Sequence, residues 1–206
     1  MKIILENIGK QYKNDWIFQH IQSEFNINQS IAIVGPNGSG KSTFINIISG
    51  HTIPTSGNIS YLLNSKQIKQ EEIYQYISVC SPYIELIEEF TIKENINWYV
   101  TLKKLKNNLN IYDVINLLSI PKNDTKKLSN YSSGIKQRVK LALSILSDTP
   151  ILLLDEPCAN LDAAGIKWYN DLISMHSLNR IIFISSNNNP SEIAFCSKKF
   201  EITSFK

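Results

Sequence analysis

A glycine-rich segment at residues 35–43 constrains this chain more than any other feature. The segment reads Gly-Pro-Asn-Gly-Ser-Gly-Lys-Ser-Thr, between the apolar runs 31–34 and 44–48. A strand, a loop of the form GxxxxGK[ST] and a helix, in that order, make a phosphate-binding loop. The glycines allow the tight backbone that points N–H groups at phosphate oxygens, and the dipole of the following helix favours an anion. We therefore predict that the chain binds a nucleoside triphosphate.

Two side chains of this loop have individual predicted roles. The Lys41 ammonium is expected to reach the β- and γ-phosphates, and the Ser42 hydroxyl is expected to bind Mg²⁺. The whole segment makes up the predicted nucleotide-binding set, which consists of Gly35, Pro36, Asn37, Gly38, Ser39, Gly40, Lys41, Ser42 and Thr43.

A second motif supplies carboxylates. The run 151–154 reads Ile-Leu-Leu-Leu without polar alternation, which is typical of a strand buried on both faces of a parallel sheet. It ends in Asp155 and Glu156, and open α/β sheets bind ligands at the carboxyl ends of their strands. We expect Asp155 to hold Mg²⁺, directly or through water. We expect Glu156 to orient the water that attacks the γ-phosphate.

A third motif indicates the family. Residues 131–138 read Tyr-Ser-Ser-Gly-Ile-Lys-Gln-Arg and open a helical stretch that runs to residue 146. Ser132 is a good N-cap, and the free N–H groups after it can bind a γ-phosphate. With the two other motifs in the same order, the chain resembles the nucleotide-binding domain of ATP-binding-cassette (ABC) proteins over essentially all of residues 1–206. The signature of that family is Leu-Ser-Gly-Gly, followed by Gln or by a string similar to Lys-Gln-Arg.

The resemblance implies roles for further residues. Ser132, Ser133 and Gly134 would contact the γ-phosphate in trans, on the ATP held by a partner's phosphate loop. The segment 159–162, Ala-Asn-Leu-Asp, matches the D-loop, which places Asp162 at the dimer interface. Tyr12 lies where the family has an aromatic side chain that stacks on adenine. Trp16 is a rival for that role.

Two positions depart from the family pattern. The strand before the helical subdomain ends in Gln in the family, whereas the matching stretch 77–82 ends in Pro82, which has no side-chain donor or acceptor. The family has a His after a late strand, where this chain has Asn187, which can donate a hydrogen bond but cannot take a proton as imidazole does. Ser133 replaces the first Gly of the signature, a milder change. We interpret these departures as signs of a slower or differently gated ATPase.

The resemblance also implies the architecture. It predicts a single ABC ATPase domain over residues 1–206, of the α/β class, with a P-loop NTPase core and a mainly parallel sheet. A small N-terminal antiparallel β subdomain and a helical subdomain inserted at about residues 82–148 complete it. Between residues 2 and 30 the pattern predicts short strands, with turns at 7–9 and 13–15. We find no internal repeat, so one nucleotide site per chain is expected.

Composition narrows the remaining choices. The chain has 206 residues, a net charge of +3 and three cysteines without a CxxC pair. The mild charge predicts no nucleic-acid partner, and the cysteines suit a reduced cytosolic protein. The apolar start of the chain is too short for a signal peptide, and no run is long enough to span a membrane.

The predicted function follows from the family. The chain is expected to be the Mg-dependent ATPase subunit of an ABC transporter, with ATP and Mg²⁺ as cofactors. It would dimerise around ATP with a second ABC ATPase chain, identical or not. It would drive separate transmembrane permease subunits from the cytoplasmic face of the inner membrane. The signature string and the short chain favour an exporter-type system. The alternative is a soluble ABC ATPase of a scaffold or assembly complex with no transport role.

Overall fold

The computed structural model describes residues 1–121, 124–187 and 189–206, which form two compact units. The first unit comprises Met1–Val79, Thr149–Glu156 and Ser177–Lys206, and the second comprises Cys80–Asp148 and Pro157–His176. No helix in the described part of the chain combines the length and the hydropathy needed to cross a membrane. The helical insertion at about residues 82–148 overlaps the first segment of the second unit, and its role as a subdomain stays a prediction.

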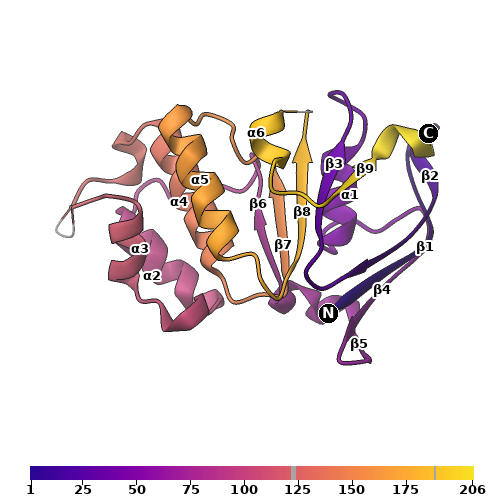
Figure 1. The fold of residues 1–206 in the computed structure, drawn as a ribbon, viewed down its shortest axis with the longest axis horizontal. Coiled ribbons are helices and arrows are strands. Elements are labelled where there is room, and N and C mark those ends of the chain that lie inside the picture. The colour runs from indigo at the N-terminus through magenta and orange to yellow at the C-terminus, as the bar shows by residue number, and fades with distance from the viewer. Residues whose placement is uncertain (122–123, 188) are drawn as a thin grey trace. The chain divides into compact units, whose positions relative to one another are not determined.

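An antiparallel sheet occupies the N-terminal part of the first unit (Figure 1). Its strand order is β2-β1-β4-β5, and the strands are β1 (Lys2–Tyr12), β2 (Asp15–Asn26), β4 (Ser56–Leu63) and β5 (Lys66–Ile68). This sheet confirms the predicted antiparallel part of the fold.

One predicted turn in this sheet is wrong. The chain turns at residues 13–14, as expected, but β1 continues without interruption through residues 7–9. The polar stretch there is a bulge, because the pairing of β1 with β2 shifts register between Leu5 and Ile8 and Asn7 has a φ of 52°. The Asn7 side chain is tied to the partner strand by a 2.8 Å hydrogen bond with His20 Nδ1. A residue in the left-handed region therefore bends a strand here without ending it.

A second sheet carries the parallel core. Its order is β6-β7-β8-β3-β9, with β3 (Ser30–Val34), β6 (Ile77–Cys80), β7 (Ile151–Asp155), β8 (Ile181–Ser186) and β9 (Lys198–Glu201). The pairs β3–β8, β3–β9 and β7–β8 are parallel. Every residue of β3, β7 and β8 is buried, which explains their unbroken apolar runs. The sequence prediction of a mainly parallel sheet is confirmed.

Helices complete the two units. The first unit contains α1 (Lys41–Ile48), which packs against β7 and β8, and the short α6 (Pro190–Ile193). The second contains α2 (Ile92–Leu102), α3 (Ile111–Leu117), α4 (Ser133–Leu146) and α5 (Ala163–Met175). Short 3-10 helices lie at Gln70–Tyr76, Lys106–Asn108, Leu128–Asn130 and Ile202–Phe205.

Aromatic side chains connect the two sheets beneath the glycine-rich loop. Phe18 of β2 meets Phe44 of α1 edge to face at 6.0 Å, and Phe44 stacks on Phe200 of β9 at 5.0 Å. Phe25 of β2 meets Phe183 of β8 at 4.8 Å. Such pairs add about 0.5–1.5 kcal/mol each beyond the area that they bury. The start of α1 is therefore supported from both sheets.

Candidate active site

The glycine-rich loop joins the end of β3 to the start of α1. Gly40 precedes the helix with a φ of 103°, and a Cβ atom there would lie 2.4 Å from Ile17 Cγ2, so only glycine fits. The Ser39 side chain is buried, and its hydroxyl has no hydrogen-bond partner within the described residues. Leaving a buried hydroxyl unpaired costs about 1–3 kcal/mol, and a ligand oxygen would recover that cost. The loop therefore fits a polar ligand.

Lys41 is buried at the first position of α1, and only 5% of its surface is exposed. Its Nζ donates hydrogen bonds to the carbonyl oxygens of Gly35 at 2.9 Å and Pro36 at 3.1 Å. Burial lowers the pKa of Lys41 below its ordinary value, and the carboxylates of Glu156, Asp155 and Glu192 oppose that shift. The ammonium is thus held by loop carbonyls under the influence of three carboxylates, and phosphate oxygens that enter the loop would replace carbonyl or amide acceptors around it.

The parallel register brings the motifs together at one edge of the sheet. Asp155 pairs with Ser185 between β7 and β8, and Val34 pairs with Ser186 between β3 and β8. The carboxyl ends of β3, β7 and β8 therefore lie side by side. The Asp155 carboxylate is 3% exposed and accepts a 2.6 Å hydrogen bond from Ser185 Oγ, which fixes its direction. Ser42 lies one residue into α1 and is half-buried.

Glu156 has a strained backbone at the end of β7. Its φ is 49°, in the left-handed region, and its N–H donates to the Ser185 carbonyl at 3.0 Å. Such conformations cost about 1–3 kcal/mol and persist where the surroundings enforce them, often at functional sites. The Glu156 carboxylate accepts a 2.9 Å hydrogen bond from Asn187 Nδ2. This backbone conformation turns Glu156 away from the direction of β7, so that its side chain reaches Asn187.

Asn187 connects the two charged groups of the site. Its Oδ1 accepts a hydrogen bond of 2.5 Å from Lys41 Nζ, while its Nδ2 donates to Glu156 Oε1. The side-chain amide therefore bridges ammonium and carboxylate with opposite ends. The sequence pattern predicts only that Asn187 can donate a hydrogen bond, and it does not indicate this bridge, because the bonded residues are 146 and 31 positions apart.

The two aromatic candidates for adenine stacking lie at the hairpin end of β1 and β2. Tyr12 is 49% exposed, and the Lys10 ammonium lies 5.0 Å from the centre of its ring. Trp16 is 39% exposed, and its ring edge would be 3.0 Å from a Cβ atom at Gly9. Trp16 thus packs more closely on its own strand pair, and Tyr12 is the more exposed ring, with Lys10 over one of its faces. Tyr12 as the stacking residue stays a proposal, with Trp16 as the rival.

The signature residues open α4 in the second unit. Ser132 is the N-cap, and its hydroxyl accepts a hydrogen bond from the Ile135 N–H at 3.4 Å. Ser132 and Ser133 are exposed, so the start of this helix is open to a ligand or a partner. A Cβ atom at Gly134 would lie 2.9 Å from the Asn160 carbonyl oxygen, so the glycine permits a close approach of the D-loop.

The D-loop leads into α5. The Asp162 side chain caps that helix and accepts a 2.7 Å hydrogen bond from the Gly165 N–H. Sequence reasoning missed Gln137, which is buried on α4 and donates a 2.9 Å hydrogen bond from Nε2 to the Pro157 carbonyl oxygen. Its place four residues before buried Leu141 was the available signal of a core-facing polar residue.

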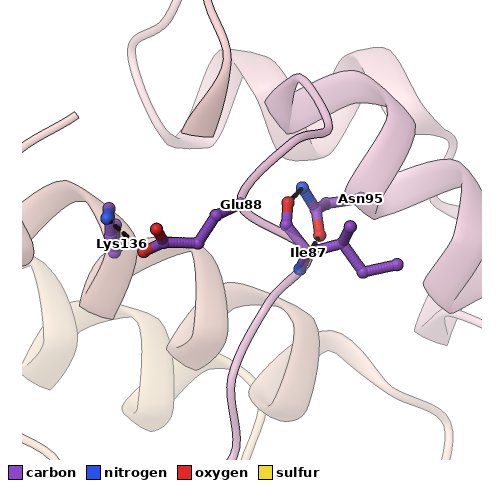
Figure 2. Close-up of polar contacts among 4 residues, drawn as sticks. All are labelled: Ile87, Glu88, Asn95 and Lys136. Atoms are coloured by element: carbon purple, nitrogen blue, oxygen red, sulfur yellow. Dashed lines mark hydrogen bonds and ion pairs between the residues drawn. The ribbon is translucent and has the colours of Figure 1, made fainter. Parts of the chain in front are cut away.

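The acidic segment at residues 85–89, before α2, is held by contacts within the second unit (Figure 2). Asn95 is buried, and its amide exchanges two 2.9 Å hydrogen bonds with the backbone of Ile87. Glu88 forms an ion pair with Lys136 of α4 at 2.5 Å. The segment is therefore attached both to α2 and to the signature helix.

We expect Asn95→Ala to destabilise the protein by about 2 kcal/mol, because the substitution leaves the Ile87 N–H and carbonyl without these partners. The free energy of unfolding in urea measures the effect. Asn97→Ala is the matched control, on an exposed position of the same helix, and should change stability by less than about 0.5 kcal/mol. Equal stability of the two variants would contradict this role of Asn95.

Comparison with known proteins identifies the family. The family model "ABC transporter" matches residues 18–159. "ABC transporter I family member 1" of Arabidopsis thaliana is 29% identical over 197 residues, which cover 93% of this chain and 84% of the relative. An uncharacterized ABC transporter ATP-binding protein of Bacillus subtilis (strain 168), YybJ, is 27% identical over 95% of this chain and 90% of its own length.

A solved structure shares the fold. The dimeric, post-hydrolysis form of an ATP-binding cassette bound to ADP and Pi superposes with a TM-score of 0.76 at 19% identity, over 98% of this chain and 95% of the other. The chain therefore belongs to the ABC transporter family and has the fold of its ATP-binding cassettes. The sequence predictions of the family, of the fold class and of an ABC-type ATPase are confirmed.

Proposed function

We propose that this chain is the ATP-hydrolysing subunit of an ABC transporter, which dimerises around ATP and drives separate transmembrane permease subunits. The observation that carries the proposal is the bridge from Lys41 through Asn187 to Glu156, built beside a phosphate-binding loop. The names of the curated relatives favour transport over the alternative of a soluble scaffold ATPase.

The site residues divide the chemistry among them. The Lys41 ammonium binds the β- and γ-phosphates, and the N–H groups of the loop hold the phosphate oxygens. The buried Ser39 hydroxyl, without a partner in the described residues, has a phosphate oxygen as its natural acceptor. The hydroxyl of Ser42 and the carboxylate of Asp155 are hard oxygen donors, which fit Mg²⁺ because that ion keeps water and phosphate oxygens as its other ligands. When bound, Mg²⁺ would neutralise charge on the phosphates.

Glu156 acts on the water in this proposal. Its carboxylate accepts a hydrogen bond from the water and takes the proton as the water attacks the γ-phosphate. Asn187 Nδ2 donates to Glu156 Oε1 and holds the carboxylate in place, and the second oxygen serves the water. Asn187 thus supplies orientation, and it cannot supply the proton transfer of an imidazole.

A partner chain completes the site. One chain has one phosphate loop. Its signature residues Ser132, Ser133 and Gly134, of which the two serines are exposed, would bind the γ-phosphate held by the partner, with Asp162 at the interface. A two-fold arrangement gives two such sites, in a homodimer or a heterodimer. The dimeric state of the cassette that shares this fold supports the proposal.

A groove in the second unit suits the membrane partner. Its volume is about 180 Å³, and Pro82, Glu85, Lys136 and Lys140 are among the residues that line it. Ser133 and Asn160 line it as well, so the groove adjoins the surface proposed to meet the second ATPase chain. Side chains of both charges around Pro82 offer contacts to a polar segment of a permease on the cytoplasmic face of the membrane. Glu88 lines it too and is already paired with Lys136, so Glu85 is the freer acidic group for such contacts. An exporter-type permease remains part of this proposal.

Release of phosphate from Mg-ATP by the purified chain tests this function, with Lys41→Ala as the background.

We expect Pro82→Gln combined with Asn187→His to raise turnover about tenfold, which lowers the activation free energy by about 1.4 kcal/mol. Gln can contact Mg²⁺ and water, and His can contact both the γ-phosphate and the catalytic carboxylate. The change should appear in kcat more than in ATP affinity.

Both single variants accompany this double variant, because the loss of Pro82 also frees the backbone of the loop. If the double variant is folded and hydrolyses no faster than wild type, these two residues do not limit turnover.

A further inference from the structure

A buried carboxylate lies beside the site without a part in the chemistry described so far. Glu192 of α6 is 5% exposed, and its Oε2 accepts a 2.5 Å hydrogen bond from Ser186 Oγ. Glu is rarely buried to this degree unless it is partnered, because removing a carboxylate from water is costly. Ser186 is the last residue of β8 and directly precedes Asn187. Glu192 therefore holds the residue next to the bridging amide.

The hydroxyl of Ser186 is engaged on both sides. It donates to Glu192 and accepts a 3.1 Å hydrogen bond from the Asn189 N–H. The Glu192 N–H in turn donates to the Asn189 carbonyl at 3.0 Å. Ser186 and Asn189, which lie on either side of Asn187 in the chain, are thus bonded to each other and to α6. A side-chain amide that must reach two charged groups at once depends on such a fixed backbone.

Glu192 also acts on the electrostatics of the loop. Its charge favours the ammonium form of Lys41, together with the charges of Glu156 and Asp155, although it lies on a different element. The hydrogen bond from Ser186 Oγ is the contact through which Glu192 reaches the backbone beside Asn187.

We propose that Glu192 is a positioning residue that acts through Ser186 to hold Asn187 where its amide reaches both Lys41 and Glu156. This inference rests on the proposed function, because it assigns Glu192 a part in the same hydrolytic site. In this arrangement the hydrogen-bond acceptor at position 192 matters, and its volume alone does not.

Double-mutant cycles on turnover test the proposal. We expect Glu192→Ala and Ser186→Ala each to lower kcat about tenfold and to change ATP affinity less than threefold. Glu192→Gln keeps an acceptor for the hydroxyl and should retain at least half of kcat. In an Asn187→Ala background, neither alanine variant should lower kcat further, because the residue that they position is gone. Glu6→Ala, on an exposed position of β1, is the control.

Amide exchange gives a second measurement that does not need hydrolysis. The Asn189 N–H donates to Ser186 Oγ, so it should exchange faster with D₂O in Ser186→Ala and Glu192→Ala than in wild type, and at the wild-type rate in Glu192→Gln. If Glu192→Ala does not fold, Ser186→Ala carries both measurements.

Two results would overturn the inference: an equal loss of kcat from the alanine variants with and without Asn187, or unchanged Asn189 exchange. Absence of hydrolysis in wild type would instead contradict the proposed function, and the exchange rates would still decide the role of Glu192.

Discussion

Lys41→Ala should abolish ATP binding while the fold stays intact. In the described part of the first unit, the Lys41 ammonium is the cation that donates hydrogen bonds to carbonyl oxygens of the loop. The distances are 2.9 Å to Gly35 and 3.1 Å to Pro36. Hydrogen bonds to charged groups contribute about 1.5–3 kcal/mol each, so the loss of one bond to the β-phosphate and one to the γ-phosphate should lower ATP affinity at least about 10²-fold. Calorimetric titration with Mg-ATP measures the loss.

Lys66→Ala, on an exposed position of β5, is the matched control and should bind ATP as wild type does. Unchanged affinity of Lys41→Ala, in a protein with wild-type circular dichroism, would refute the assignment of the nucleotide to this loop.

Glu156→Gln should keep ATP binding and lose about 10²-fold in turnover, the amount expected for removal of a general base. Glutamine retains an oxygen that accepts from Asn187 Nδ2, so the 2.9 Å contact and the strained backbone can persist. What the amide loses is the ability to take a proton from water. Steady-state phosphate release gives kcat, and calorimetry gives the affinity.

Glu201→Gln, on an exposed position of β9, controls for the loss of a carboxylate from the first unit. Turnover of Glu156→Gln within twofold of wild type would show that another group activates the water.

Much of the fold and of the site could be predicted because it is encoded locally. The loop at 35–43 carries its own turn chemistry, and the unbroken apolar runs of β3, β7 and β8 reflect burial on both faces. The capping hydroxyl of Ser132 was likewise readable from a few neighbouring residues. In each case the sequence signal lies within a segment of about ten residues, although the packing that buries the strands involves distant ones.

The other features of the fold and the site depend on contacts between side chains that no pattern in the sequence indicates. The bulge at Asn7 depends on the neighbouring strand β2, whose Gln22 and His20 side chains form hydrogen bonds with Asn7 and favour a bent strand over a turn. Asn187 joins residues far apart in the chain, and no motif in the sequence marks Glu192 as a buried carboxylate. Hydrophobic periodicity reports which face is buried, and it carries no information on which polar groups meet at a sheet edge.

The mass of Glu156→Gln in solution, measured by sedimentation with Mg-ATP and with Mg-ADP, tests dimerisation around ATP. The ATP-bound protein should sediment as a dimer, because the signature residues of one chain hold the γ-phosphate bound by the other. The ADP-bound protein should be a monomer. Adding Ser133→Asp should abolish the dimer, since a carboxylate at the start of α4 repels the γ-phosphate while suiting the helix dipole. A monomer with both nucleotides would contradict the proposal that two chains dimerise around ATP.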